Sequence, residues 1–259
     1  MNIIDTHCHI NDEGLYRDRV SVVQRSKDKG VKALFNNADS LESFDVILSL
    51  QKEFPRFCYS VLGIHPEYAN RGDEYFSKAY EEIIRHRDEI KAIGEIGLDY
   101  HYDKSEETKN IQKKRFIEQI KLADELNLPI VIHSRDADFD TLDIIKENLP
   151  NKLDLHCYSG SAEILREYLK LPIEIYIGVG GVSTFKNAKT IQNIIKEIDI
   201  SHILSETDCP YLTPTPHRGE RNEPFYLDLI LKQIAELRGE PLEEVADKIY
   251  NNGKKFYGI

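Results

Sequence analysis

The strict alternation of short apolar runs with longer segments of helical spacing is the feature that most constrains how this 259-residue chain can fold. Several runs are apolar on both faces, which is typical of parallel strands that are buried on both sides. The eight predicted strands span residues 2–10, 31–38, 57–65, 90–98, 129–134, 152–159, 173–181 and 202–208. Strands that alternate with helices predict a parallel α/β sheet.

The intervening segments carry helical signals. Phe116, Ile120 and Ala123 form one apolar stripe at helical spacing. Two further helices are predicted after the eighth strand, at residues 225–238 and 241–250, where they would close the fold.

The fold class follows from strand number and length. Eight strands in about 250 residues are typical of a TIM (β/α)8 barrel, and no repeat, low-complexity tract or Pro/Gly/Ser linker divides the chain. We therefore expect a single barrel domain over residues 1–259. A doubly wound open sheet shows the same alternation and stays open as an alternative.

Composition limits the class of protein. The formal net charge is −11, which opposes general polyanion binding, because such affinity comes mainly from cationic side chains on phosphates. None of the four cysteines forms a CxxC pair, no uncharged run approaches ~18 residues, and we expect no secretory leader. We expect a soluble cytoplasmic protein with reduced thiols and no membrane association.

The first predicted strand contains the motif Asp-Thr-His-Cys-His at residues 5–9. Side chains alternate along a strand, so His7 and His9 point the same way, ~6–7 Å apart, and can converge on one ion. Solvent exposure on an edge strand would be the simpler reading, but Ile3, Ile4 and Ile10 make the segment apolar on both faces. A buried histidine needs a partner.

Other side chains of metal-ligand type fall at or near the carboxyl ends of predicted strands, the face where such barrels build their active sites. The six candidate ligands are His7, His9, Glu95, His133, His156 and Asp208. Six nitrogen and oxygen donors suit two divalent ions that share a bridging carboxylate. Our hypothesis gives His7, His9, Glu95 and Asp208 to the first ion and Glu95, His133 and His156 to the second. The nitrogen-rich set favours Zn²⁺, Mn²⁺, Co²⁺ or Ni²⁺ over Mg²⁺ on affinity, although cellular supply can decide otherwise.

The chain resembles the TatD family of metal-dependent deoxyribonucleases within the amidohydrolase-like barrel enzymes. The resemblance rests on the ordered motifs DTHCHI, LGIHP, AIGEIGLDY, LPIVIHSRDA, HCYSG, GVGGVSTFKNAK, ETDCPYLTP and HRGERNEP. It implies a TIM-barrel hydrolase that acts on phosphodiesters, trimming DNA from a 3′ end, and it carries the ligand roles onto the same six residues. Glu95 stands at the bridging position, where some relatives use a carbamylated lysine.

Two ions would lower the pKa of a bound water, so no protein nucleophile is required. Asp208 is the candidate general base, with metal binding alone as the alternative. Glu206 and Asp5 are candidates for orienting the ligands, although Asp5 fits a plain structural role equally well. His65, also assigned a catalytic role, would contact a substrate phosphate or a metal-bound oxygen, or else cap the turn before Pro66.

Substrate contacts are expected from cations and aromatics near the metal motifs. The candidates are Arg135, Arg218, Arg221 and Tyr100, each of which could instead be an ordinary loop residue. Arginine can clamp phosphate, and aromatic rings can stack unpaired bases. The expected partner is therefore DNA at single-stranded or frayed 3′ ends, bound by a monomer. Hydrolysis of a small amide, lactone or ester by a binuclear centre is the alternative function, and a non-enzymatic metal-binding scaffold comes third.

Overall fold

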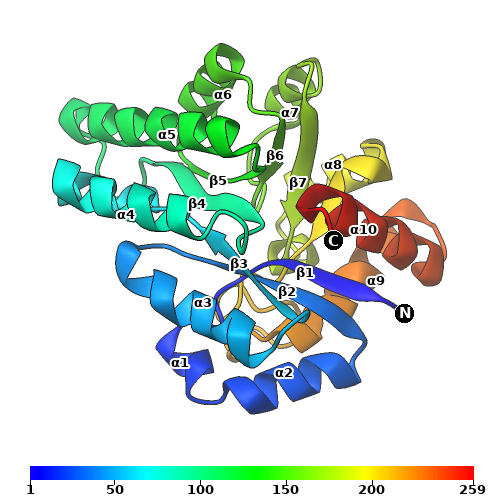
Figure 1. Cartoon of the computed structure of the whole chain (residues 1–259). Helices are drawn as coiled ribbons and strands as arrows, with labels where there is room; N and C mark the ends of the chain where they lie inside the picture. Colours follow the sequence, from blue (N-terminus) through cyan, green and yellow to red (C-terminus); the bar gives the residue numbers. More distant parts are fainter. The chain divides into compact units, whose positions relative to one another are not determined.

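The structure is a computed structural model that describes residues 1–259, and all eight predicted strands are present in it. Figure 1 shows them in chain order, alternating with helices. The strands are β1 (Ile3–Cys8), β2 (Val31–Asn37), β3 (Cys58–Leu62), β4 (Ala92–Asp99), β5 (Ile130–Arg135), β6 (Lys152–Leu155), β7 (Glu174–Val179) and β8 (Ile203–Ser205). The polar motif residues at 206–209 therefore follow β8 and do not belong to it.

Ten α-helices accompany the strands. They are α1 (Glu13–Tyr16), α2 (Arg19–Asp28), α3 (Phe44–Glu53), α4 (Asp73–Arg85), α5 (Glu106–Leu126), α6 (Asp138–Asn148), α7 (Ala162–Tyr168), α8 (Lys189–Glu197), α9 (Leu227–Arg238) and α10 (Leu242–Tyr257). The last helix runs past the predicted end at residue 250, because Phe256 and Tyr257 are buried and Gly258 ends it in the left-handed conformation. None of the helices has the length and apolarity needed to cross a membrane.

The strands form one parallel sheet whose order, β1 through β8, is the order of the sequence. The last strand lies against the first, because Ser205 Oγ donates to the Ile4 carbonyl at 3.1 Å and Thr6 Oγ1 donates to the Ser205 carbonyl at 3.1 Å. Sequential order with β8 beside β1 is the topology of the predicted TIM (β/α)8 barrel. It excludes the doubly wound sheet, in which the strand order reverses at a switch point.

The chain consists of two compact units, each made of separate stretches of sequence. One unit comprises Met1–Asn36, Ser49–Tyr59 and Tyr176–Ile259, and the other comprises Asn37–Leu48 and Ser60–Ile175. The expectation of a single domain over residues 1–259 stays a prediction.

In the first unit, α10 packs on β1 beside the histidine pair. The Tyr257 ring stacks on Phe35, with centroids 3.5 Å apart, and its hydroxyl donates to the Thr6 carbonyl at 2.7 Å. Gly253 faces the same strand, where an added Cβ would lie 3.2 Å from Ile4. The C-terminal helix thus fixes the backbone that carries His7.

In the second unit, α5 braces the chain at two points through buried glutamines. Gln119 accepts from the Ile64 amide at 2.8 Å and donates to the Ile64 carbonyl at 3.1 Å. Two helical turns earlier, Gln112 accepts from the Asp99 amide and donates to the Asp99 carbonyl, both at 2.9 Å. These paired bonds fix the backbone beside His65 and at the end of β4.

Candidate metal centre

A cluster at the carboxyl ends of β1 and β8, which we call the β1–β8 cluster, consists of His7, His9 and Asp208. The two Nε2 atoms lie 3.1 Å apart. Asp208 Oδ1 lies 3.4 Å from His9 Nε2 and 3.8 Å from His7 Nε2. The convergence predicted from the alternation of the strand is therefore present, and the acidic residue after β8 joins it.

These distances fit a shared cation. Two nitrogen ligands of a tetrahedral Zn²⁺, each at ~2.0–2.1 Å from the metal, lie about 3.3 Å apart. The His7 side chain is fully buried, and those of His9 and Asp208 are only 12% and 13% exposed. Donor type, spacing and burial therefore match one ion, which these three side chains could hold.

The backbone behind this cluster is held by Asp5. Its Oδ2 accepts from Thr207 Oγ1 at 2.6 Å, and its Oδ1 accepts from the Thr207 amide at 2.9 Å and the His7 amide at 3.4 Å. Burial raises the pKa of Asp5 to about 8, against the effect of the Thr207 hydrogen bonds. Asp5 thus ties β1 to the segment after β8 through the hydroxyl and the amide of Thr207, and it makes no hydrogen bond to an imidazole ring in this network.

Asp208 is positioned by an unusual backbone conformation. Its φ is 55°, in the left-handed region, and its amide donates to the His7 carbonyl at 2.9 Å. Such a conformation costs a non-glycine residue on the order of 1 kcal/mol and is concentrated at functional sites. Glu206, predicted to orient the ligands, is fully buried two residues earlier.

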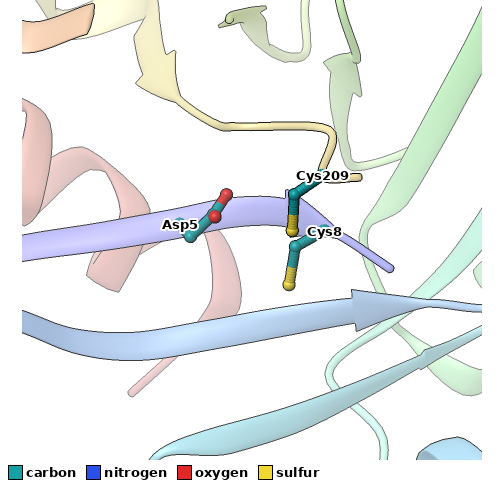
Figure 2. A group of neighbouring side chains, drawn as sticks. All are labelled: Asp5, Cys8 and Cys209. Carbon is teal, nitrogen blue, oxygen red and sulfur yellow. The ribbon is translucent and has the colours of Figure 1, made fainter. Parts of the chain in front are cut away.

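Two buried cysteines lie beside Asp5. Figure 2 shows Asp5 and Cys8 on β1 and Cys209 on the segment after β8, and their ligand atoms lie within 4.8 Å of one another. Cys8 Sγ donates to the Phe35 carbonyl at 3.3 Å, and burial raises the pKa of its thiol well above the usual value. Both cysteines are fully buried and pack beside Asp5 as small apolar side chains.

A second cluster, the β4–β6 cluster, surrounds the Glu95 carboxylate. Glu95 Oε1 lies 2.8 Å from His133 Nδ1, 3.5 Å from His156 Nε2 and 3.7 Å from His65 Nε2. The Glu95 side chain is 6% exposed. One buried carboxylate among three imidazoles is a donor set that suits a divalent transition metal.

Asp99 belongs to this cluster, although it is not among the site residues predicted from the sequence. Its Oδ2 lies 3.0 Å from His133 Nε2, so His133 stands between two carboxylates. Burial lowers the pKa of His133, but the hydrogen bonds with Asp99 and Glu95 outweigh it and raise the pKa to about 9. For Asp99, burial raises the pKa, while the hydrogen bonds from His133 and the His101 amide lower it to below its usual value.

A signal for Asp99 was present in the sequence. Glu95 and Asp99 are four residues apart on β4, so strand periodicity places them on one face. Gly97 stands between them, and an added Cβ there would lie 2.0 Å from the His133 carbonyl oxygen. The motif GEIGLD therefore carries two carboxylates toward His133 and leaves room for the His133 backbone.

His65 caps a turn, which is one of the two roles predicted for it from the sequence. Its Nδ1 accepts from the Glu67 amide at 3.2 Å, which caps the short 3₁₀ helix Pro66–Arg71. Its ring also meets that of His133 edge to face, with centroids 4.4 Å apart. Capping and membership of the cluster are therefore compatible, and a contact with substrate stays a prediction.

The candidate substrate residues of the second unit differ in exposure. Tyr100 is 5% exposed, and its hydroxyl donates to Asp140 at 2.8 Å, so its ring offers no open face. Tyr102 is 72% exposed, and the Arg135 guanidinium carbon lies 5.4 Å from its ring centroid. The pair formed by Tyr102 and Arg135 lies where β5 ends and is better suited to a base or phosphate than Tyr100.

The two arginines of the first unit already have protein partners. Arg221 donates to the Gly14 carbonyl, to Asp18 at 2.9 Å and to Glu223. Arg218 lies 3.8 Å over the Phe185 ring. Arg221 therefore joins a network that links the loop before α9 to α1 and α2, and its predicted contact with substrate would have to compete with that network.

Comparison with known protein sequences gives consistent matches over nearly the whole chain. The model of a family described as TatD related DNase matches residues 4–258. The chain is 40% identical to the metal-dependent hydrolase YabD of Bacillus subtilis (strain 168), over 99% of each chain. It is 35% identical to the metal-dependent hydrolase MJ1582 of Methanocaldococcus jannaschii, over 98% of this chain and 96% of that one.

Solved structures agree with these matches. The crystal structure of YjjV, a TatD homologue from Escherichia coli K12, superposes with a TM-score of 0.92 at 28% identity, covering 99% of this chain and 98% of that one. An organophosphorus hydrolase from Deinococcus radiodurans superposes with a TM-score of 0.70 at 10% identity, over 99% of this chain and 92% of that one. The second likeness shows a common fold.

Proposed function

We propose that this chain, which belongs to the TatD-related DNase family of metal-dependent hydrolases, cleaves phosphodiester bonds in DNA, trimming from a 3′ end. The observation that carries the proposal is the pair of buried donor clusters, one of His7, His9 and Asp208 and one centred on Glu95. Nitrogen and carboxylate donors in this number suit the divalent ions that phosphodiester hydrolysis uses.

We assign two divalent ions to these donors. The first would be held by His7, His9, Glu95 and Asp208, and the second by Glu95, His133 and His156, with Glu95 shared between them. This division rests on the order of the ligands along the chain and on the family. Zn²⁺, Mn²⁺, Co²⁺, Ni²⁺ or Mg²⁺ are all compatible with the donors. When bound, such ions lower the pKa of water and draw charge from a phosphoryl oxygen.

The protein's own groups have separate tasks in this reaction. Asp208 Oδ1 takes the proton of the attacking water, as a general base placed 3.4 Å from His9 Nε2. His65 and Arg135 contact the phosphate, and the exposed Tyr102 ring stacks an unpaired base. No serine, threonine or cysteine nucleophile is needed.

Charge distribution supports a single-stranded substrate. The chain has a net charge of −11, so a long duplex would meet repulsion along its length. A few unpaired nucleotides need only local cations and aromatic rings. We therefore propose single-stranded or frayed 3′ ends as the substrate of a monomeric cytoplasmic enzyme.

A substrate screen on purified, metal-loaded protein tests the proposal. Bis-p-nitrophenyl phosphate and single-stranded DNA labelled at either end should be hydrolysed, with loss of nucleotides from the 3′ end. Simple amides and lactones should not be hydrolysed. A chelator should abolish hydrolysis and added metal should restore it.

Other outcomes of this screen would be equally clear. Hydrolysis of amides or lactones without any phosphodiesterase activity would favour the binuclear amidohydrolase. No hydrolysis at any metal loading would leave only a binding scaffold. Release of internal fragments from the labelled DNA would contradict trimming from the 3′ end.

A further inference from the structure

Both carboxylate oxygens and both backbone polar groups of Asp99 have hydrogen-bond partners within the protein. Oδ1 accepts from the His101 amide at 2.8 Å, and Oδ2 lies 3.0 Å from His133 Nε2. Its amide and carbonyl are both bonded to Gln112, at 2.9 Å each. The residue is 4% exposed. The carboxylate therefore cannot turn away from His133 without also losing the hydrogen bond from the His101 amide.

The two ring nitrogens of His133 have different surroundings. Nδ1 lies 2.8 Å from Glu95 Oε1, on the side where His65 and His156 also approach that carboxylate. Nε2 lies against Asp99 alone in this network. An ionised carboxylate only accepts hydrogen bonds, so the Asp99 contact requires a proton on Nε2 and, without a bound ion, the Glu95 contact requires one on Nδ1. A metal ion at Nδ1 would replace the second of these protons and leave the first.

We infer that Asp99 is a positioning residue, which holds the proton of His133 on Nε2 and thereby makes Nδ1 the nitrogen that binds metal. The inference rests on the proposed function, in which His133 is a ligand. A histidine ligand whose other nitrogen donates to a carboxylate has a fixed tautomer and ring orientation, and it is also a more basic donor. Asp99 thus acts through His133 and touches neither the substrate nor the ion.

Asp99→Asn is the sharpest variant, because the His101 amide selects the orientation of the new side chain. The amide oxygen has to accept from the His101 N–H, so the amide nitrogen lies opposite His133 Nε2. Two donors then face each other unless the His133 proton moves to Nδ1. In that tautomer Nδ1 cannot bind a metal.

Asp103→Asn is a control from the loop that follows β4. Asp103 also accepts two hydrogen bonds, from the Ser105 amide at 2.8 Å and from Thr108 Oγ1 at 2.6 Å, but none from a histidine. A general effect of removing a hydrogen-bonded carboxylate from this part of the chain would appear in both variants. An effect through His133 would appear only in Asp99→Asn.

The test is nitrogen NMR of protein labelled with ¹⁵N-histidine and loaded with ¹¹³Cd²⁺ alone, with His133 assigned from the His133→Gln variant. We expect one-bond cadmium coupling at His133 Nδ1 and a proton on Nε2 in the wild-type protein and in Asp103→Asn. In Asp99→Asn the coupling at His133 should be lost. Its affinity for Cd²⁺, measured by competition with a chelator, should fall roughly 10–100-fold at the site that contains His133.

The possible failures can be told apart. Coupling at Nε2 in the wild-type protein, or unchanged coupling and affinity in Asp99→Asn, would overturn the role of Asp99 and leave the metal centre intact. A folded wild-type protein in which Cd²⁺ binds without any coupling to His133 would remove His133 from the ligands, and with it the assignment of the second ion.

Discussion

At the scale of single residues, two arginines that were both predicted to bind substrate differ in their surroundings. Arg135 is exposed beside Tyr102, whereas Arg221 is bonded to Gly14, Asp18 and Glu223. We predict that Arg135→Ala raises KM for single-stranded DNA severalfold at unchanged metal content. Arg221→Ala should instead lower the free energy of unfolding by on the order of 1 kcal/mol, since it removes two partly exposed hydrogen-bonded ion pairs, with Asp18 and Glu223.

Steady-state kinetics and urea unfolding of the two variants measure this difference. Arg87, which is 60% exposed and precedes the amino end of β4, supplies the control Arg87→Ala, which should change neither quantity. A rise in KM for Arg221→Ala without loss of stability would return Arg221 to the substrate site.

At the scale of elements, the contact between β4 and β5 depends on Gly97. An added Cβ would lie 2.0 Å from the His133 carbonyl oxygen, and Gly97 has a φ of 141°. Gly97→Ala should therefore destabilise the protein by roughly 3 kcal/mol or more and lower its metal content, because both strand packing and His133 are disturbed.

Gly239 provides the matched control, since it has a φ of 65° but no atom within 4 Å of an added Cβ. Gly239→Ala should cost only the ~1–2 kcal/mol of left-handed backbone and keep its metal. Thermal unfolding and metal analysis of both variants measure these effects on stability and metal content. Equal losses in the two variants would show that the close approach at Gly97 does not matter.

Much of the element arrangement follows from local signals, and the rest depends on tertiary contacts. The eight strands and the convergence of His7 and His9 follow from apolar runs and strand alternation, which are properties of neighbouring residues. The hydroxyl of buried Tyr100 donates to Asp140, and the Arg221 guanidinium donates to Asp18. Those partners are distant in sequence, so a single sequence does not reveal them.

At the scale of the whole molecule, the net charge of −11 limits the affinity of the protein for long nucleic acids. Few phosphates can be neutralised, so we predict duplex affinity weaker than ~10⁻⁴ M at physiological salt and a slope of log K against log salt no steeper than about −2. Fluorescence anisotropy with blunt, frayed and single-stranded oligonucleotides measures both. Tight binding to blunt duplex with no preference for ends would contradict a substrate gripped at a few nucleotides.

The metal centre itself is tested most directly by metal content per chain, determined by mass spectrometry beside steady-state kinetics, for wild type, Glu95→Ala and Asp208→Asn. The wild-type protein should hold two ions. Glu95→Ala removes the carboxylate that three imidazoles surround, so metal and activity should fall together. Asp208→Asn keeps a neutral oxygen but cannot take a proton, so it should retain metal while kcat falls roughly 10²–10⁴-fold with KM unchanged. A wild-type protein that is fully active without metal, or an Asp208→Asn variant that loses metal in proportion to its activity, would contradict this assignment of ligands and base.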